Sequence, residues 1–247
     1  MAPKGKAKDN KPSAPNNNNS TPTNWPAFKP LIPPEDLSLN TVVTDQIITI
    51  SNFFTSTLCK TFVSFLSTLP LQTTPGKPKR GDAVRVNDRF QIDDPLFARR
   101  LWDETGLRDL VRGEETEQLW GGKVIGLNPN IRVYRYVKGQ FFAPHYDDSN
   151  TLSLPTEPSS STIPCKTTWT LLIYLTSPST GCLGGETVFY PDNPDPKSKK
   201  DQEPVVISLE TGMALLHRHG SDCMLHEGRE VLAGEKWVIR SDLCVER

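Results

Sequence analysis

A histidine and an aspartate two positions apart could act together on one metal ion. His145 and Asp147 lie in the stretch APHYDD, residues 143–148, which follows a predicted strand over residues 131–136 and a Lys-Gly turn. Residues two apart in a strand point to the same face, so this imidazole and this carboxylate can approach one ion. An HxD triplet often arises by chance, and a hydrogen-bonded surface pair is the alternative interpretation.

The other three histidines of the chain lie far downstream, at His217, His219 and His226. Two histidines and one carboxylate form the ligand set of non-haem Fe(II) oxygenases, which leaves coordination positions open for a cosubstrate and O₂. Strand pairing in a jelly roll can bring His226 beside His145. His217 and His219 are a rival pair, but we expect His219 to lie next to the ligands or in a turn, because no basic strand follows it at a suitable distance.

Two basic residues follow His226 in one predicted strand, Lys236 ten positions later and Arg240 four positions beyond that. Both share a face with Val238, so both cations can point in one direction. A buried cation is costly unless it is paired. A bound dicarboxylate would supply the partner, and either cation could hold it.

Two amphipathic segments predict helices ahead of the strand-rich region. Over residues 55–69, apolar side chains recur at three- and four-residue spacing, and Pro70 ends the pattern. Over residues 95–104, Asp94 can cap the first turn, and a proline occupies the first helical position. An apolar stretch over residues 42–50 predicts an opening strand.

Short apolar segments separated by glycines and prolines follow Gly121. They are IRVYRY, TTWTLLIYL, TVFY, PVVISL, MALLH and KWVIR. Several short strands at regular spacing predict a sandwich, a jelly roll or a barrel. Together with the two helices, they predict an α+β chain dominated by a double-sheet β core.

Charge and hydropathy exclude several classes of protein. The 247 residues include 28 Lys and Arg against 29 Asp and Glu, a net charge of −1, which argues against a nucleic-acid binder held by phosphate contacts. No apolar run approaches the roughly 18 residues that a membrane span needs. The start, MAPKGKAKDNK, lacks the apolar stretch of a secretory signal, so we expect a cytoplasmic or nuclear protein.

Composition also divides the chain. Residues 1–40 hold 8 of the 22 prolines and an asparagine run, and we predict a disordered, low-complexity tail there, followed by one domain over residues 41–247. The five cysteines are widely spaced, odd in number and without a CxxC pair, which predicts buried, reduced thiols and no zinc site built on cysteine.

Five segments in order resemble the Fe(II)/2-oxoglutarate dioxygenase superfamily, and within it the prolyl 4-hydroxylase-like group. They are YRYVKGQFFAPHYDD, TTWTLLIYLT, LGGETVFYP, GMALL and HEGREVLAGEKWVIRSD. They extend over about residues 125–247, which the resemblance identifies as a double-stranded β-helix (jelly roll) core. The preceding helices are similar to the family's supporting N-terminal helices.

The resemblance also implies roles for individual residues. His145, Asp147 and His226 would bind Fe(II), and Lys236 would hold the distal carboxylate of 2-oxoglutarate, with Arg240 as the competitor. Two tyrosines would hydrogen-bond the cosubstrate, and they are Tyr174 and Tyr136. The glycine pair at 184–185 matches a turn before a strand that lines the site.

The implied reaction is hydroxylation of an unactivated C–H bond with release of succinate and CO₂, with O₂ as oxidant and ascorbate as reductant. The resemblance favours a prolyl or other protein residue as substrate. The alternatives are the same chemistry on a small molecule, or a catalytically silent jelly-roll binding protein. Nothing in the sequence indicates an oligomeric state.

Two further segments have open interpretations. The polar cluster RVNDR, residues 85–89, either reads substrate at the mouth of the site or is a plain surface loop. The insert over residues 149–166, rich in Ser, Thr and Pro, is either a lid over the substrate or a disordered loop.

Overall fold

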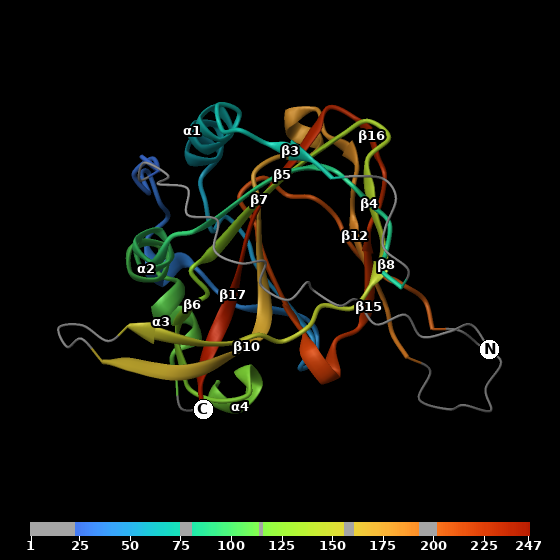
Figure 1. Cartoon of the computed structure of the whole chain (residues 1–247). Coiled ribbons are helices and arrows are strands. Elements are labelled where there is room, and N and C mark those ends of the chain that lie inside the picture. Colours follow the sequence, from blue (N-terminus) through green and yellow to red (C-terminus); the bar gives the residue numbers. More distant parts are fainter. Residues whose placement is uncertain (1–22, 75–80, 114–115, 156–160, 193–201) are drawn as a thin grey trace.

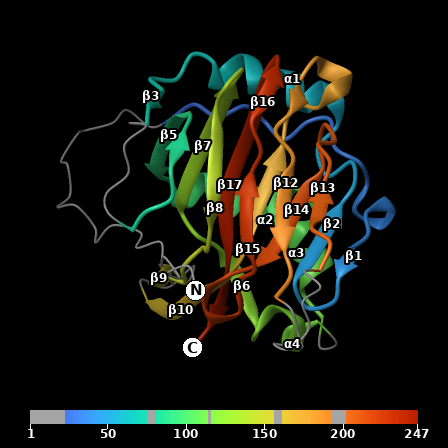
Figure 2. The ribbon, with the colours of Figure 1, turned by 90° about the vertical axis from the view of Figure 1, so that its right-hand side faces the viewer.

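Two antiparallel sheets face each other in the computed structural model of the chain, which describes residues 23–74, 81–113, 116–155, 161–192 and 202–247. Figure 1 shows strands β7, β17 and β10 of the larger sheet in the middle, helices α1, α2 and α3 on one side of it, and β8, β15 and β12 of the smaller sheet on the other. Turned by 90°, Figure 2 shows the smaller sheet from its outer side. The predicted jelly roll with supporting helices is confirmed.

Within the described residues, the larger sheet has ten strands, all paired antiparallel. Its main order is β1 (Asn40–Val43), β2 (Ile47–Ile50), β14 (Ala214–Arg218), β10 (Thr162–Tyr174), β17 (Glu235–Glu246), β7 (Asn130–Val137), β5 (Asp88–Asp93) and β3 (Gln72–Thr73). Two further strands attach beside this path, β6 (Val124–Leu127) to β17 and β9 (Thr151–Pro155) to β10.

The smaller sheet has five strands in the order β13 (Val205–Ile207), β12 (Thr187–Tyr190), β15 (Leu225–Gly228), β8 (Phe141–His145) and β4 (Arg85–Val86). A separate pair joins β11 (Leu183–Gly184) to β16 (Val231–Ala233). Because β8 and β15 are neighbours in this sheet, segments far apart in the sequence come together in its middle.

The helices are α1 (Ser56–Leu66), α2 (Pro95–Glu104), α3 (Leu107–Val111) and α4 (Glu117–Trp120), with single 3₁₀ turns at η1 (Pro34–Asp36), η2 (Pro178–Thr180) and η3 (Gly220–Asp222). Asp94 caps α2 as predicted, since its Oδ1 accepts a hydrogen bond from Phe97 N at 2.9 Å. The Thr55 hydroxyl does the same for α1. Helix α1 ends at Leu66, three residues before the predicted end.

The apolar stretch over residues 42–50 forms two strands, where the sequence predicted one. Strands β1 and β2 pair antiparallel, with Thr41 opposite Ile48. The turn between them contains Asp45 at a positive φ of 57°. Aspartate tolerates this left-handed conformation better than most residues, which lets the chain reverse within an otherwise apolar run.

Strand periodicity divides the core into two layers. Trp169, Leu171 and Ile173 of β10 belong to the cluster that packs on the helices. Tyr174 of β10 and Val238 of β17 point the other way, into the cluster between the two sheets. The side chains that carry chemistry lie in this second layer.

Residues 23–40 differ from the tail predicted for residues 1–40. Trp25 and Phe28 are 7 % and 3 % exposed and pack in the helix-side core, and Leu37 is buried there as well. The Trp25 ring lies 4.1 Å from that of Phe97, and its Nε1 donates a hydrogen bond to Asp94 Oδ2 at 2.8 Å. The high proline content of residues 1–40 led to the prediction of a tail, although these three apolar side chains belong to the core. Residues 1–22 lie outside the described residues, and the predicted disorder is untested there.

Replacing Phe28 with alanine is expected to lower the free energy of unfolding by about 3–5 kcal/mol, because the change empties a site between three aromatic rings. Leu96→Ala is the matched control, since Leu96 is 68 % exposed and should cost less than about 0.5 kcal/mol. Urea titration of both variants measures the difference. Equal, small losses would show that the 23–40 segment does not stabilise the fold.

The described part of the 149–166 insert is mostly a hairpin formed by β9 and the first half of β10. Strand β9 pairs with the first half of β10, with Leu152 opposite Cys165. Leu154 packs toward Gly126 of β6, where a Cβ added to the glycine would lie 3.2 Å from the leucine side chain, so the hairpin lies beside the larger sheet.

No helix in the described ranges has the length and apolar character of a membrane span.

Candidate active site

Strand pairing places the first predicted histidine opposite the last. In the ladder between β8 and β15, His145 is the direct partner of His226, and their ring centroids are 4.2 Å apart. Asp147 follows two residues after the end of β8, with Oδ1 3.7 Å from His145 Nε2 and Oδ2 3.8 Å from His226 Nε2. Each of the three is at most 6 % exposed. Their ligand atoms all lie within 4.8 Å of one another.

Hydrogen bonds orient both imidazoles for metal binding. His145 Nδ1 lies 2.9 Å from the Ala143 carbonyl oxygen, and His226 Nδ1 lies 3.0 Å from that of Met224. A carbonyl can only accept, so each Nδ1 carries the proton and each Nε2 lone pair faces Asp147. Metal-bound histidines are held in this way by a hydrogen bond from the other ring nitrogen.

The protonation states also suit a divalent cation. Burial lowers the pKa of His145 well below its usual value, and the pKa of His226 shifts in the same direction, so both rings are neutral. Burial would raise the pKa of Asp147, but the Arg240 guanidinium beside it holds this pKa well below its usual range. Two neutral imidazoles and one carboxylate are the donor set that fits Fe(II) with coordination positions left open.

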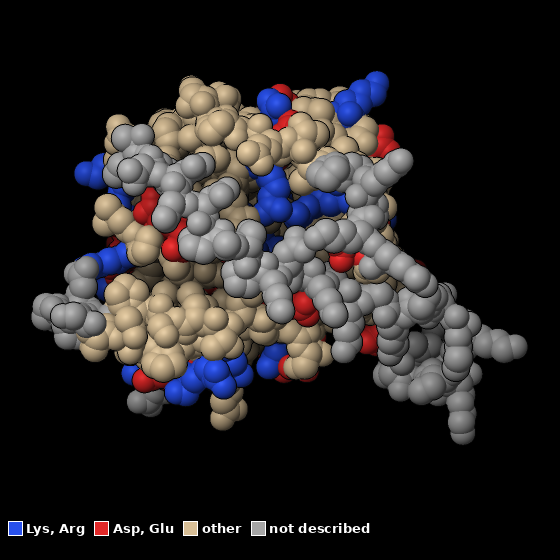
Figure 3. Space-filling model, viewed as in Figure 1, with Lys and Arg blue, Asp and Glu red and all other residues tan. Residues whose placement is uncertain are grey.

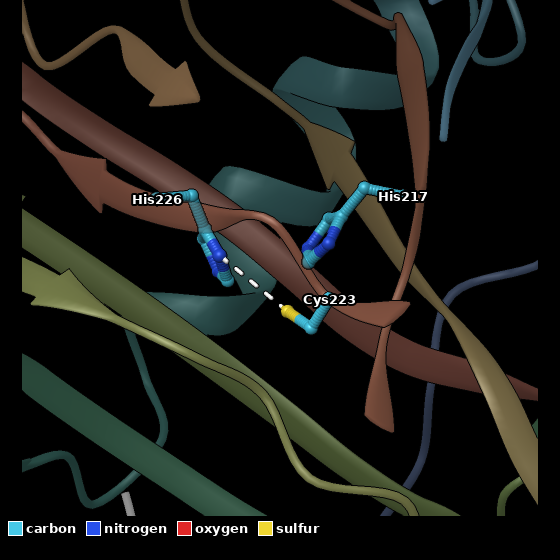
Figure 4. A group of neighbouring side chains, drawn as sticks. All are labelled: His217, Cys223 and His226. Atoms are coloured by element: carbon cyan, nitrogen blue, oxygen red, sulfur yellow. Dashed lines mark hydrogen bonds between the residues drawn. The ribbon is translucent and has the colours of Figure 1, made fainter. Parts of the chain in front are cut away.

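His217 and Cys223 also lie in this cluster, a placement that the sequence does not predict. Figure 4 shows their side chains pointing toward His226. His217 Nε2 is 3.7 Å from Asp147 Oδ2, and Cys223 Sγ is 3.9 Å from His226 Nδ1. The pairing of β14 with β10 and β2 brings His217 here, a long-range contact that residue spacing does not reveal.

His219 lies beside the predicted ligands, as expected, and outside both groups of residues that could hold a metal. Its Nδ1 is 2.9 Å from the Thr170 hydroxyl, which donates a hydrogen bond to Asp147 Oδ2 at 3.0 Å. Its Nε2 is 2.9 Å from the Thr167 hydroxyl. Both ring nitrogens are therefore engaged, and the contacts orient Asp147 through Thr170.

Lys236 and Arg240 share the inner face of β17 but have different partners. Arg240 Nη2 lies 3.0 Å from Asp147 Oδ2, and Arg240 Nε lies 3.4 Å from Asp242 Oδ1. Lys236 Nζ donates a hydrogen bond to the Gly185 carbonyl oxygen at 2.7 Å, and no described residue forms an ion pair with it. Of the two cations, Lys236 is the one that lacks a carboxylate partner among the described residues.

Aromatic rings surround Lys236. Its Nζ is 5.5 Å from the ring centroid of Tyr136 and 5.4 Å from that of Tyr174. Tyr174 also shares a hydrogen bond of 2.6 Å with the Thr187 hydroxyl. Burial lowers the pKa of Lys236 to about 8. A buried ammonium group with apolar walls and few acceptors is suited to receive an anionic ligand.

The glycine pair at 184–185 forms the turn beside Lys236. Gly184 has a φ of +73°, and a Cβ there would lie 2.5 Å from the Glu230 carbonyl oxygen. Gly185 has a φ of +77° and supplies the carbonyl oxygen that Lys236 contacts. Glycine is therefore required for this backbone to approach β16 and the lysine at once.

A buried ionic cluster supports the far end of β17. Asp242 accepts hydrogen bonds from Arg132 Nη2 and, at 2.9 Å, from Asn128 Nδ2, and it also pairs with Arg240. Burial alone would raise the pKa of Asp242, but Arg132 and Arg240 lower it to about 2. The cluster holds Arg240, and through it Asp147, in place.

Arg132→Ala is expected to lower the free energy of unfolding by about 3–5 kcal/mol, because it leaves a buried carboxylate undercompensated. The lowered pKa of Asp242 contributes stability that is present above about pH 4 and is lost as the pH falls toward 2. Arg108→Ala is the control, since its pair with Asp103 is exposed and worth at most about 1 kcal/mol. Denaturant titrations should separate the two variants; similar losses would contradict the assigned role of the cluster.

The polar cluster over residues 85–89 has side chains in two places: Arg85 lies near the predicted metal ligands, and Asp88 is buried in the protein interior. Arg85 lies 4.8 Å from the Phe142 ring centroid and 5.6 Å from that of Tyr134, and Phe142 stacks on His145 at 3.5 Å. Asp88 faces the other way and pairs with Arg135. Figure 3 shows Lys and Arg side chains gathered at the centre of the face between β7 and β4. Arg85 therefore places a positive charge beside the ring that stacks on His145.

Comparison with known proteins agrees with this geometry. Residues 131–241, which include every predicted site residue, match the family model of the 2OG-Fe(II) oxygenase superfamily. The resemblance to the 2-oxoglutarate-dependent oxygenases is therefore confirmed for this region of the chain. No curated protein matches the sequence.

Solved structures share the fold at low sequence identity. A prolyl-4-hydroxylase from Pseudomonas putida is 12% identical, with a TM-score of 0.52 over 82% of this chain and 94% of that one. The viral collagen prolyl hydroxylase vCPH from Paramecium Bursaria Chlorella virus-1, in its 2OG complex, is 18% identical over 82% and 99% (TM-score 0.47). HygX from Streptomyces hygroscopicus, with nickel and 2-oxoglutarate bound, is 16% identical over 82% and 84% (TM-score 0.49).

Proposed function

We propose that the chain binds Fe(II) through His145, Asp147 and His226 and uses 2-oxoglutarate and O₂ to hydroxylate an unactivated C–H bond, releasing succinate and CO₂. The observation that carries this proposal is the convergence of two imidazole Nε2 atoms on one buried carboxylate. Bound iron would supply the O₂-dependent oxidation that no side chain of the protein can perform.

The protein's own residues would prepare the site. The carbonyl groups of Ala143 and Met224 fix the tautomers of the two histidines, so that both lone pairs face the same point. Thr170 and Arg240 hold the Asp147 carboxylate from its other side. This support reduces the reorganisation that metal binding requires.

Lys236 is our candidate for the distal carboxylate of 2-oxoglutarate. It lies on the same face of β17 as Arg240, whose guanidinium already contacts two carboxylates. Tyr136 and Tyr174 flank the ammonium group and would line the cosubstrate. Their apolar rings exclude water around the charge pair, which strengthens it.

For the substrate, we propose a prolyl or other protein residue, with a small molecule as the second candidate. The fold shared with the Pseudomonas putida prolyl-4-hydroxylase is consistent with the first. Phe142 and Arg85 line the approach to His145 and would contact the substrate. Ascorbate would serve as the reductant that restores Fe(II) after uncoupled turnover.

A turnover assay tests the proposal. The full chain with Fe(II), 2-oxoglutarate and ascorbate is assayed for succinate against proline-containing peptides and a metabolite library. We expect substrate-stimulated succinate formation with a product that has gained one oxygen atom. If succinate never exceeds the level of an Asp147→Ala variant, the proposed activity is wrong; stimulation only by metabolites would reassign the substrate to a small molecule.

A further inference from the structure

A second set of potential metal ligands overlaps the proposed iron site. His217, Cys223 and His226 are all buried, and one ligand atom of each lies within 4.8 Å of the other two. In Figure 4 the three side chains converge from β14, the segment after η3, and β15. The set therefore contains a sulfur ligand, which the set of His145, Asp147 and His226 lacks.

One ring nitrogen of His217 has no hydrogen-bond partner among the described residues. In the part of the chain that the structure describes, nothing hydrogen-bonds to His217 Nδ1, although the residue is 1 % exposed. A buried polar atom without a partner is rare in a native protein, and a bound ion is one of its standard explanations. His219, two residues along, has both ring nitrogens engaged, so the unpaired atom is specific to His217.

The surroundings of Cys223 suit a metal-bound sulfur. Its Sγ accepts a hydrogen bond from the Asp147 backbone N–H at 3.3 Å. Burial and the Asp147 carboxylate raise the pKa of this thiol to about 12, so the thiolate would form only together with a bound cation. It also lies 3.9 Å from His226 Nδ1, close to the separation of two ligands around one tetrahedral ion. Sulfur together with imidazole nitrogens favours a zinc-class ion over iron with oxygen ligands.

We propose that His217, Cys223 and His226 form a second metal site for a zinc-class divalent ion, and that this site and the proposed iron site exclude each other. His226 is shared, and a neutral imidazole has one lone pair, on one nitrogen at a time. With Nδ1 protonated and bonded to the Met224 carbonyl, as in this structure, Nε2 serves the set with Asp147. A metal ion on the second site requires the other tautomer, in which Nδ1 gives up that hydrogen bond and binds the ion beside Cys223. A zinc-class ion on the second site withdraws His226 from iron and stops the oxygenase.

The spacing of cysteines in the sequence predicted no zinc site, because the ligands are not clustered as a CxxC motif. Only the pairing of β14 and β15 with their different sheets brings a single cysteine between two histidines. The three potential ligands therefore come together only in the folded chain.

Cobalt absorption tests the sulfur ligand directly. The full chain, stripped of metal with a chelator and kept reduced with a phosphine, is titrated with Co²⁺ without 2-oxoglutarate. We expect a thiolate-to-cobalt band in the near ultraviolet, lost in Cys223→Ser and retained in Cys182→Ser, a second buried cysteine outside the cluster. His217→Ala should weaken Co²⁺ binding by at least about tenfold, while His219→Ala should not. Absence of the band in the wild-type protein, or its persistence in Cys223→Ser, overturns the proposal.

X-ray absorption of the zinc-loaded wild-type protein needs no variant and no turnover. We expect one sulfur neighbour at about 2.3 Å together with nitrogen at about 2.0–2.1 Å. A shell of nitrogen and oxygen only would place zinc on His145, Asp147 and His226 and overturn the second site. Both readouts are independent of 2-oxoglutarate oxidation, so the proposed oxygenase activity can fail without affecting them.

Discussion

Replacing His226 with alanine is expected to abolish 2-oxoglutarate turnover and to weaken Fe(II) binding by more than the roughly 10- to 100-fold that loss of an outer partner of a metal ligand costs. The reason is geometric, because His226 is the cross-strand partner of His145, and its Nε2 lies 3.8 Å from Asp147 in the group of three potential metal ligands that they form. Anaerobic Fe(II) titration and succinate formation measure the two effects.

His219→Ala is the matched control for this experiment. Its ring hydrogen-bonds Thr170 and Thr167 and contributes no atom to the proposed triad. We expect Fe(II) binding to survive in this variant, with a reduced rate because Thr170 contacts Asp147. Loss of iron from His219→Ala together with retention by His226→Ala would mean that the downstream ligand is wrongly assigned.

Lys236→Ala is expected to weaken 2-oxoglutarate binding by about 30- to several-thousand-fold, which corresponds to roughly 2–5 kcal/mol for removing one partner of a desolvated charge pair. Iron affinity should change little, because Lys236 contacts Gly185 and two tyrosine rings and none of the proposed ligands. Titration of 2-oxoglutarate with iron saturating measures the effect.

Arg240→Ala is the comparison for this prediction. It should act mainly on folding stability and iron affinity, since Arg240 pairs with Asp147 and Asp242. A larger loss of 2-oxoglutarate affinity in Arg240→Ala than in Lys236→Ala would reassign the carboxylate partner. No effect from either substitution would contradict a cationic cosubstrate site on β17.

The pH dependence of binding gives a second measure of Lys236. Its pKa of about 8 in the free protein means that the ammonium form predominates below pH 8 and declines above it. A bound carboxylate requires that form, so 2-oxoglutarate affinity should be constant below pH 8 and fall about tenfold per pH unit above it. Lys236→Arg should remove this decline, because arginine stays protonated throughout the range.

The helices and the central strands could be predicted because their residues follow local rules. Asp94 and the following proline start α2 at the predicted residue, and the apolar run of β10 is long enough to be recognised in any context. The spacing of Lys236, Val238 and Arg240 likewise predicted one inner face on β17. These patterns arise from residues that are close together in the sequence, so they can be recognised without the structure.

The parts that could not be predicted depend on tertiary contacts. Trp25 and Phe28 lie among prolines, and only their packing against α1 and α2 shows that they belong to the core. His217 reaches Asp147 because β14 pairs with β10, and Cys223 reaches His226 across the turn after η3. Contacts of this kind are set by sheet order, which residue spacing does not encode.

The most direct test of the account is the visible absorption of the anaerobic protein with Fe(II) and 2-oxoglutarate. If His145, Asp147 and His226 hold iron and Lys236 orients the cosubstrate, a weak charge-transfer band should form in the wild-type protein. Asp147→Ala should lack it, and Lys236→Ala should reach it only at a much higher 2-oxoglutarate concentration. No band in the wild-type protein at saturating iron and 2-oxoglutarate, or an undiminished band in Asp147→Ala, would contradict the proposed site.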